Sequence, residues 1–160
     1  MIKPSHVMPL RGLQAAVSMV ILGFTAYVAN WWSKYWRDMS PAEINFLLFS
    51  SVWTLLSLAY IVTTSLSRFQ YSAFANKFAV LGVEALTMTF WFGGFVALAV
   101  FLSARVCFGN VCNVAKAGTA FAALQWLLFA ATTSFTALQA FRGTRARIEK
   151  NMDMEGSPNA

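Results

Sequence analysis

Few residues of this chain carry reactive side chains, and the two cysteines lie closest together. Cys107 and Cys112 are separated by four residues, of which Gly109 and Asn110 favour a turn. In an oxidising compartment this spacing can close a small disulfide ring. A pair of free thiols is the alternative. A zinc site is disfavoured, because the single histidine, His6, is distant in sequence and is expected on the other side of a membrane.

The acidic residue Glu84 lies inside a long apolar run. Carboxylates at such a position are rare and usually face protein or water. One hypothesis is that Glu84 pairs with a basic residue such as Arg11 or Lys77, or that it contacts a lipid headgroup or a partner. The alternative is an ordinary carboxylate close to the membrane surface.

The side chains that membrane enzymes and redox carriers require do not form a pattern in this sequence. One histidine excludes two-histidine haem ligation within the chain. The sequence contains neither a glycine-rich phosphate loop with lysine nor a carboxylate cluster suited to proton-coupled transport. We therefore expect no catalytic residues, no cofactor and no metal site, and we do not expect an enzyme.

The elements that position these residues are four long apolar runs. The chain is 58% hydrophobic and 11% charged, and that charged fraction is about half of what soluble domains carry. The runs cover residues 10–32, 44–67, 78–103 and 118–141, and each is long enough for a helix to cross a bilayer. Only helices satisfy their own backbone groups in lipid. The predicted fold class is an all-α membrane protein, a bundle of four transmembrane helices in one domain over 1–160.

The first run resembles a secretory signal because Lys3 precedes it and Arg11 lies at its start. We interpret it as a retained helix, because it exceeds the length of a signal core and Trp31 and Trp32 occupy the place of small cleavage-site residues. The basic residues are not clustered as a nucleic-acid-binding face, so their net charge of +6 does not indicate nucleic acid as a partner.

Basic residues predict the orientation of the helices. Eight fall on one side of the predicted membrane and four on the other, which places both termini in the cytoplasm. Aromatic residues that favour the headgroup layer then form a belt at the outer end of the first helix: Trp31, Trp32, Tyr35 and Trp36. The cytoplasmic set is Lys3, Arg11, Arg68, Lys77, Arg142, Arg145, Arg147 and Lys150, and the outer set is Lys34, Arg37, Arg105 and Lys116.

Small residues at helical spacing predict contact surfaces on the last two helices. They serve packing within the bundle or a dimer interface. They are Gly93, Gly94 and Ala97 on the third helix, and Gly118, Ala122, Ala130, Ser134 and Ala137 on the fourth.

Residues 142–160 are predicted to form a cytoplasmic tail that is first basic and then flexible. Arg142, Arg145, Arg147 and Lys150 are candidate contacts for anionic lipids, and they also suffice as a plain stop-transfer signal. Residues 151–160 are short and polar, and we expect them to be mobile.

Two segments resemble the MARVEL-domain family. Residues 112–129 read Cys-Asn-Val-Ala-Lys-Ala-Gly-Thr-Ala-Phe-Ala-Ala-Leu-Gln-Trp-Leu-Leu-Phe, which is similar to the start of the last helix in that family. Residues 84–99, with an acid followed by Phe-Trp-Phe and small residues, look like the third helix of its fungal branch. The resemblance implies a four-helix bundle concerned with membrane apposition, vesicle traffic or lateral membrane domains. In the fungal branch it implies plasma-membrane furrows and sphingolipid-linked organisation.

Three functions compete on this sequence. The first is a non-enzymatic scaffold that organises membrane through helix packing and contacts with membrane lipids, alone or as a homo-oligomer. The second is an accessory subunit of a larger membrane complex. The third, a small channel or transporter, is disfavoured because only Glu84 offers polar chemistry inside the bilayer. The expected location is the plasma membrane or a secretory-pathway membrane.

Overall fold

Four helices account for almost all of the chain that the structure describes. A computed structural model describes residues 7–36, 40–65, 77–104 and 109–155. The helices are α1 (Val7–Trp36), α2 (Ala42–Ser65), α3 (Lys77–Ser103) and α4 (Asn110–Glu155). All four are long and apolar enough to cross a membrane, and the spans are Met8–Tyr35, Ala42–Thr63, Phe78–Ser103 and Asn110–Gly143. The chain is thus an all-α membrane protein with four spans, as the sequence predicts.

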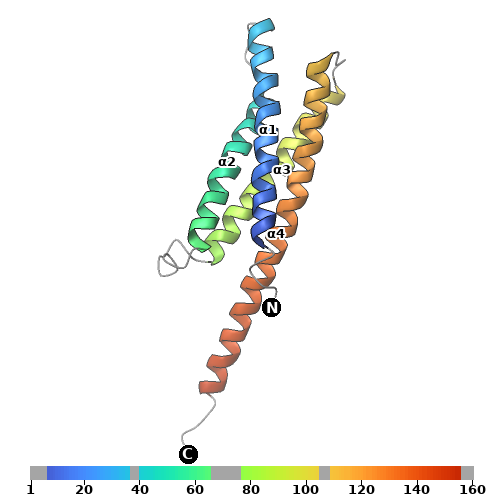
Figure 1. Ribbon diagram of the computed structural model, residues 1–160. Helices are drawn as coiled ribbons and strands as arrows, with labels where there is room; N and C mark the ends of the chain where they lie inside the picture. Colours follow the sequence, from blue (N-terminus) through green and yellow to red (C-terminus); the bar gives the residue numbers. More distant parts are fainter. Residues whose placement is uncertain (1–6, 37–39, 66–76, 105–108, 156–160) are drawn as a thin grey trace, which may run out of the picture.

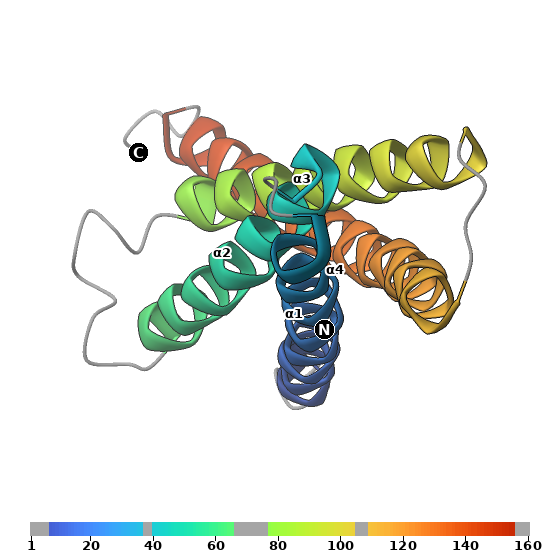
Figure 2. The ribbon, with the colours of Figure 1, turned by 90° about the horizontal axis from the view of Figure 1, so that it is seen from above.

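The helices form a ring in chain order. α1 packs against α2 and α4, and α3 packs against the same two helices. Seen from above, α1 therefore lies opposite α3 (Figure 2). The first residues of α1 and α3 and the last residues of α2 and α4 lie at the same end of the bundle, beyond which α4 continues alone (Figure 1).

The connection between α3 and α4 is shorter than predicted. The sequence placed it at residues 104–117, whereas α4 begins at Asn110. Gly109, directly before α4, has a φ of 83°, a left-handed conformation that favours glycine. Lys116 suggested a loop, but its side chain is exposed while Cys112 and Ala115 turn inward on the same helix. A charge on the outer face at a span's end does not interrupt the helix.

The start of α2 and the end of α4 also differ from the predicted limits of the apolar runs. Pro41 accepts hydrogen bonds from the backbone N–H groups of Ile44 and Asn45, at 3.0 and 3.2 Å, so α2 begins directly after it. α4 continues to Glu155, so residues 151–155, which are part of the segment predicted to be mobile, are helical and continue α4 without a break. Residues 156–160 lie outside the described part of the chain.

Each helix turns one seam of buried residues toward the centre, at alternating spacings of three and four positions. This average repeat of 3.5 is typical of helices that wrap around each other in a bundle. Many members of these seams are polar, whereas large exposed side chains on all four helices are apolar. The seams are Arg11, Gln14, Ser18, Ile21, Thr25 and Val28 on α1; Ile44, Leu47, Ser51, Thr54, Leu58 and Ile61 on α2; Glu84, Thr87, Trp91, Gly94 and Leu98 on α3; and Gly118, Ala122, Gln125, Phe129 and Thr132 on α4.

Candidate functional site

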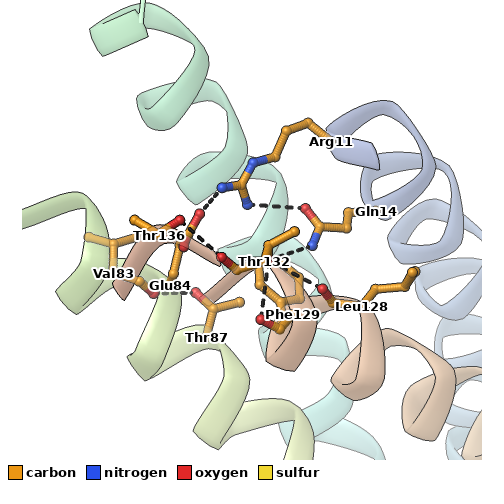
Figure 3. A network of polar contacts seen from close by, with 9 residues as sticks. All are labelled: Arg11, Gln14, Val83, Glu84, Thr87, Leu128, Phe129, Thr132 and Thr136. Carbon is orange, nitrogen blue, oxygen red and sulfur yellow. Dashed lines mark hydrogen bonds and ion pairs between the residues drawn. The ribbon is translucent and has the colours of Figure 1, made fainter. Parts of the chain in front are cut away.

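An ion pair joins the two opposite helices near one end of the bundle. Arg11 of α1 contacts the carboxylate of Glu84 on α3, and the two side chains are 9% and 0% exposed (Figure 3). Arg11 lies about 6 Å along α1 from its first residue, and Glu84 about 10 Å along α3. Both charges are therefore inside their spans, where each alone would be costly and where each compensates the other.

Gln14 extends this ion pair to α4. Arg11 Nη1 donates a hydrogen bond to Gln14 Oε1 at 3.2 Å, and Gln14 Nε2 donates to Thr132 Oγ1 at 3.2 Å. Thr132 and Thr136 of α4 lie beside the pair (Figure 3). Three helices thus meet at one polar cluster, which we call the Arg11 cluster: Arg11, Gln14, Glu84 and Thr132.

A second contact between α1 and α4 lies deeper in the bundle. Gln125 is fully buried, and its Nε2 donates to the Gln14 carbonyl oxygen at 3.0 Å and to Ser18 Oγ at 2.9 Å. Because lipid offers no hydrogen bonds, an amide at this depth favours the one rotation of α4 that turns it to α1.

Two tryptophan–threonine hydrogen bonds join α2 to α3. Trp91 Nε1 of α3 donates to Thr54 Oγ1 at 2.9 Å, and Trp53 Nε1 of α2 donates to Thr87 Oγ1 at 3.1 Å. Each threonine in turn donates to the carbonyl oxygen four residues earlier, at 2.8 and 2.7 Å. The threonines therefore act as donor and acceptor at once, and the two indoles gain partners that buried tryptophans require.

The predicted packing residues divide between the interior and the lipid-facing surface. Gly94 is buried, and a Cβ there would lie 2.6 Å from Leu47 Cδ2, so α2 and α3 approach closely at this point. Gly118 is buried near Phe24, and Ala122 is fully buried. Of the others, Ala130 and Ala137 are half-buried, and Gly93, Ala97 and Ser134 are exposed.

The remaining predicted residues lie at the two ends of the bundle. Near the last residue of α1, the Trp31 ring lies 6.0 Å from Trp32 and 5.2 Å from Tyr35 between ring centres, and the side chain of Trp36 is outside the described part. Arg142 and Arg145 are exposed on α4, whereas the side chains of Arg147 and Lys150 are not described. The disulfide remains a prediction because Cys107 also lies outside the described residues.

Gln14, Ser18, Gln125, Thr132 and the two tryptophan–threonine pairs did not stand out in the sequence analysis. The spacing of the polar residues on α1 could have predicted their burial. Arg11, Gln14, Ser18 and Thr25 follow the same repeat of three and four positions as the buried apolar residues. Polar residues that repeat in phase inside an apolar run are expected to face protein.

The polar groups of this site hold the helices together. The ion pair and the amide and indole hydrogen bonds each join two different helices. In the part of the chain that the structure describes, no group of three or more histidine, cysteine or acidic side chains is placed to hold a metal ion.

Comparison with known proteins agrees with this architecture. Neither the curated proteins nor the solved structures include a match to the chain. The family model named MARVEL, a membrane-associating domain, matches residues 4–135, which contain the Arg11 cluster, Gln125 and both tryptophan–threonine pairs. The match covers most of the 160 residues. The chain therefore belongs to the MARVEL family of membrane-associating domains.

Proposed function

We propose that this chain is a non-enzymatic scaffold that organises the surrounding membrane. The observation that carries the proposal is the distribution of side chains: the buried charged and amide groups contact other helices, whereas many large exposed side chains are apolar. Arg11, Glu84 and Gln125 bind other helices, whereas side chains such as Phe49 and Leu127, 49% and 55% exposed, are left to contact lipid. Such a bundle acts on its surroundings through its outer surface.

The apolar side chains of the interior argue against the channel hypothesis. Ile21, Leu47, Trp91 and Phe129 are fully buried and come from all four helices. They lie in the same seams as the polar residues, so large apolar side chains interrupt the polar groups along the bundle axis. Solute flux through the purified protein in liposomes is the measurement that would revive this hypothesis.

Contact with anionic lipid is the second part of the proposal. Arg142 and Arg145 are exposed at the level where the fourth span ends at Gly143. Each basic residue at an anionic surface contributes about 1 kcal/mol of attraction. With Arg147 and Lys150 in the next turns, the exit of α4 forms a basic region suited to the cytoplasmic leaflet.

The cellular role follows from the family and the predicted orientation. We infer that both termini are cytoplasmic, that the protein resides in the plasma membrane or the secretory pathway, and that it acts in lateral membrane domains, vesicle traffic or membrane apposition. Furrow-associated organisation, as the resemblance to the fungal branch implies, is one form of this role.

The scaffold and subunit hypotheses are separated by the neighbours of the protein. We expect the tagged full chain to gather in patches in cells, and to yield variable, lipid-dependent neighbours when crosslinked before extraction in mild detergent. A heterologous assembly of fixed composition would contradict the scaffold and identify an accessory subunit. A uniform distribution with free diffusion would contradict both.

The lipid contact is tested separately in vesicles of phosphatidylcholine with or without phosphatidylserine. We expect enrichment of the anionic lipid around the protein, and a lower enrichment for Arg142→Gln with Arg145→Gln. The matched control replaces Lys34 and Lys116, which are exposed at the opposite end. Equal enrichment in both variants would show that the exit of α4 has no special affinity for anionic lipid.

A further inference from the structure

The part of α4 that extends past the bilayer exposes large apolar side chains to water. The fourth span ends at Gly143, whereas α4 continues to Glu155, about 18 Å further along its axis. Ile148 and Met152 on this extension are 53% and 63% exposed. They lie about 7 and 13 Å beyond Gly143, at and past the outer limit of a headgroup layer that is about 6 Å thick.

Lipid headgroups therefore account for Arg142 and Arg145 but leave Met152 in water. A short helix without tertiary contacts is marginal in water, and its stability comes mainly from burying an apolar face. None of the other three helices reaches the extension (Figure 1). Within the described part of the chain, Ile148 and Met152 are left uncovered, and their apolar surface is available to a partner.

These two residues continue a stripe that runs along the outer face of the fourth span. Leu138 and Phe141 precede them at spacings of three and four, and both are more than half exposed. The stripe keeps this repeat over almost four turns on each side of Leu138, so a second helix can follow it from the membrane into the cytoplasm. Its exposed members are Leu124, Leu127, Ala131, Ser134, Leu138, Phe141, Arg145, Ile148 and Met152.

We propose that the α4 stripe pairs with the α4 stripe of a second copy of this chain, as two parallel helices. Two copies share one orientation in the membrane, so the stripe meets itself along its whole length, as a two-fold axis along the membrane normal requires. Ala131 and Ser134, the small residues of the stripe, lie within the span, where they allow two backbones to approach.

The available area is sufficient for such a pair. At roughly 100 Å² of apolar surface for each large side chain, the six large apolar members contribute about 600 Å² from each copy. The total of about 1,200 Å² is at the lower limit for specific protein interfaces. Arg145 is the one charged residue in the stripe, and it lies at the headgroup level, where anionic phosphates can separate the two guanidinium groups.

Cysteine crosslinking of the full chain in membranes tests the pairing. We expect Ile148→Cys and Met152→Cys to form covalent dimers with a short bismaleimide, and Lys150→Cys, half a turn away on the same helix, to form few. Equal yields at all three positions would indicate random collision and overturn the proposal. Crosslinks of Ile148→Cys and Met152→Cys to another protein in place of a second copy would also overturn it.

A second measurement follows energy transfer between labelled copies in liposomes as lipid is added. Since a charge in such a seam weakens pairing, Arg145→Leu is expected to keep the dimer to at least about threefold greater lipid dilution. Ile148→Lys with Met152→Lys is expected to lower transfer to that of randomly mixed copies. Energy transfer that none of these changes alters would refute pairing through the α4 stripe. This inference rests on the proposed scaffold function and names a partner for it. Its two tests measure only contact between copies of the chain, so the pairing can be refuted while the scaffold proposal stands.

Discussion

Replacing Glu84 by glutamine removes one charge of a buried ion pair. Arg11 then keeps its hydrogen bond to the side-chain oxygen of Gln14, but it has lost its counter-charge. Breaking a buried pair from one side costs about 3–5 kcal/mol. An unpaired arginine at the centre of a span costs about 2.5–3.5 kcal/mol. Because Arg11 lies only about 6 Å from the start of α1, part of this cost is relieved as its long side chain reaches toward the surface. We expect a loss of about 3 kcal/mol, which is roughly a hundredfold change in the unfolding equilibrium.

The assay is unfolding of the full chain from mild-detergent micelles by a denaturing detergent, followed by tryptophan fluorescence. Trp91 is fully buried and hydrogen-bonded between α2 and α3, so its emission reports loss of the bundle. The variants are Glu84→Gln, Arg11→Gln and the double variant, in which two amides replace the two charges. We expect the double variant to lose less than the two single losses together, with a coupling of about 2 kcal/mol or more.

Glu43→Gln is the matched control, since this acid is half-buried at the start of α2. A change within about 0.5 kcal/mol is expected there. If Glu84→Gln unfolded at the same detergent fraction as the unmodified chain, the ion pair would not hold α1 to α3. Additive losses in the double variant would show that the two residues act independently.

Two further predictions concern helix packing and the connection between α3 and α4. Gly94→Ala should cost about 1–3 kcal/mol, because its Cβ would lie 2.6 Å from the Leu47 side chain, and the same substitution should cost less when it is made in a Leu47→Ala background. Gly93→Ala, with nothing within 4 Å, should be neutral or slightly stabilising in the same unfolding assay, and equal effects at the two glycines would contradict a close contact. Cys107 and Cys112 should take up a membrane-impermeant maleimide from outside only after reduction, as a disulfide in an outer loop requires; labelling without reductant would refute the bond, and labelling only after permeabilisation would reverse the topology.

The number and approximate placement of the spans could be predicted from the sequence because lipid imposes a length and excludes charge. The ends of α4 could not be predicted in this way. Lys116 and Arg142 marked its limits in hydropathy, yet both are exposed on a helix that continues past them. A basic residue at the level of the headgroups satisfies the bilayer and leaves the backbone helical, so a change in hydropathy locates the membrane surface and not the end of the helix.

The sequence limited the basic partner of Glu84 to a few candidates, but it could not decide between them. Lys77 and Arg11 both lie near the first residue of their helices, and a sequence does not state which helices face each other. Arg11 pairs with Glu84 because both occupy the inward seam of helices on opposite sides of the ring. The tryptophan–threonine pairs were missed for a related reason, since Trp91 fits a purely apolar core as well as a hydrogen-bonded one until Thr54 is placed beside it.

The polar seam explains how four helices of similar composition adopt one arrangement. Lipid tails are as apolar as leucine, so burying one apolar face in place of another distinguishes poorly between packings. A buried amide or charge does distinguish them, because any other rotation leaves it without a partner. Arg11 with Glu84 links α1 to α3, Gln125 links α4 to α1, and the tryptophan–threonine pairs link α2 to α3.

These contacts fix the rotation of every helix from the inside. The outward residues are consequently released from any part in specifying the fold. That separation lets the outer face of α4 carry a stripe that serves another molecule, since Leu127, Leu138 and Ile148 are each more than half exposed. Stability and association are thereby assigned to opposite faces of the same helix, and for this reason the substitutions proposed for Glu84 and for Ile148 are expected to act independently.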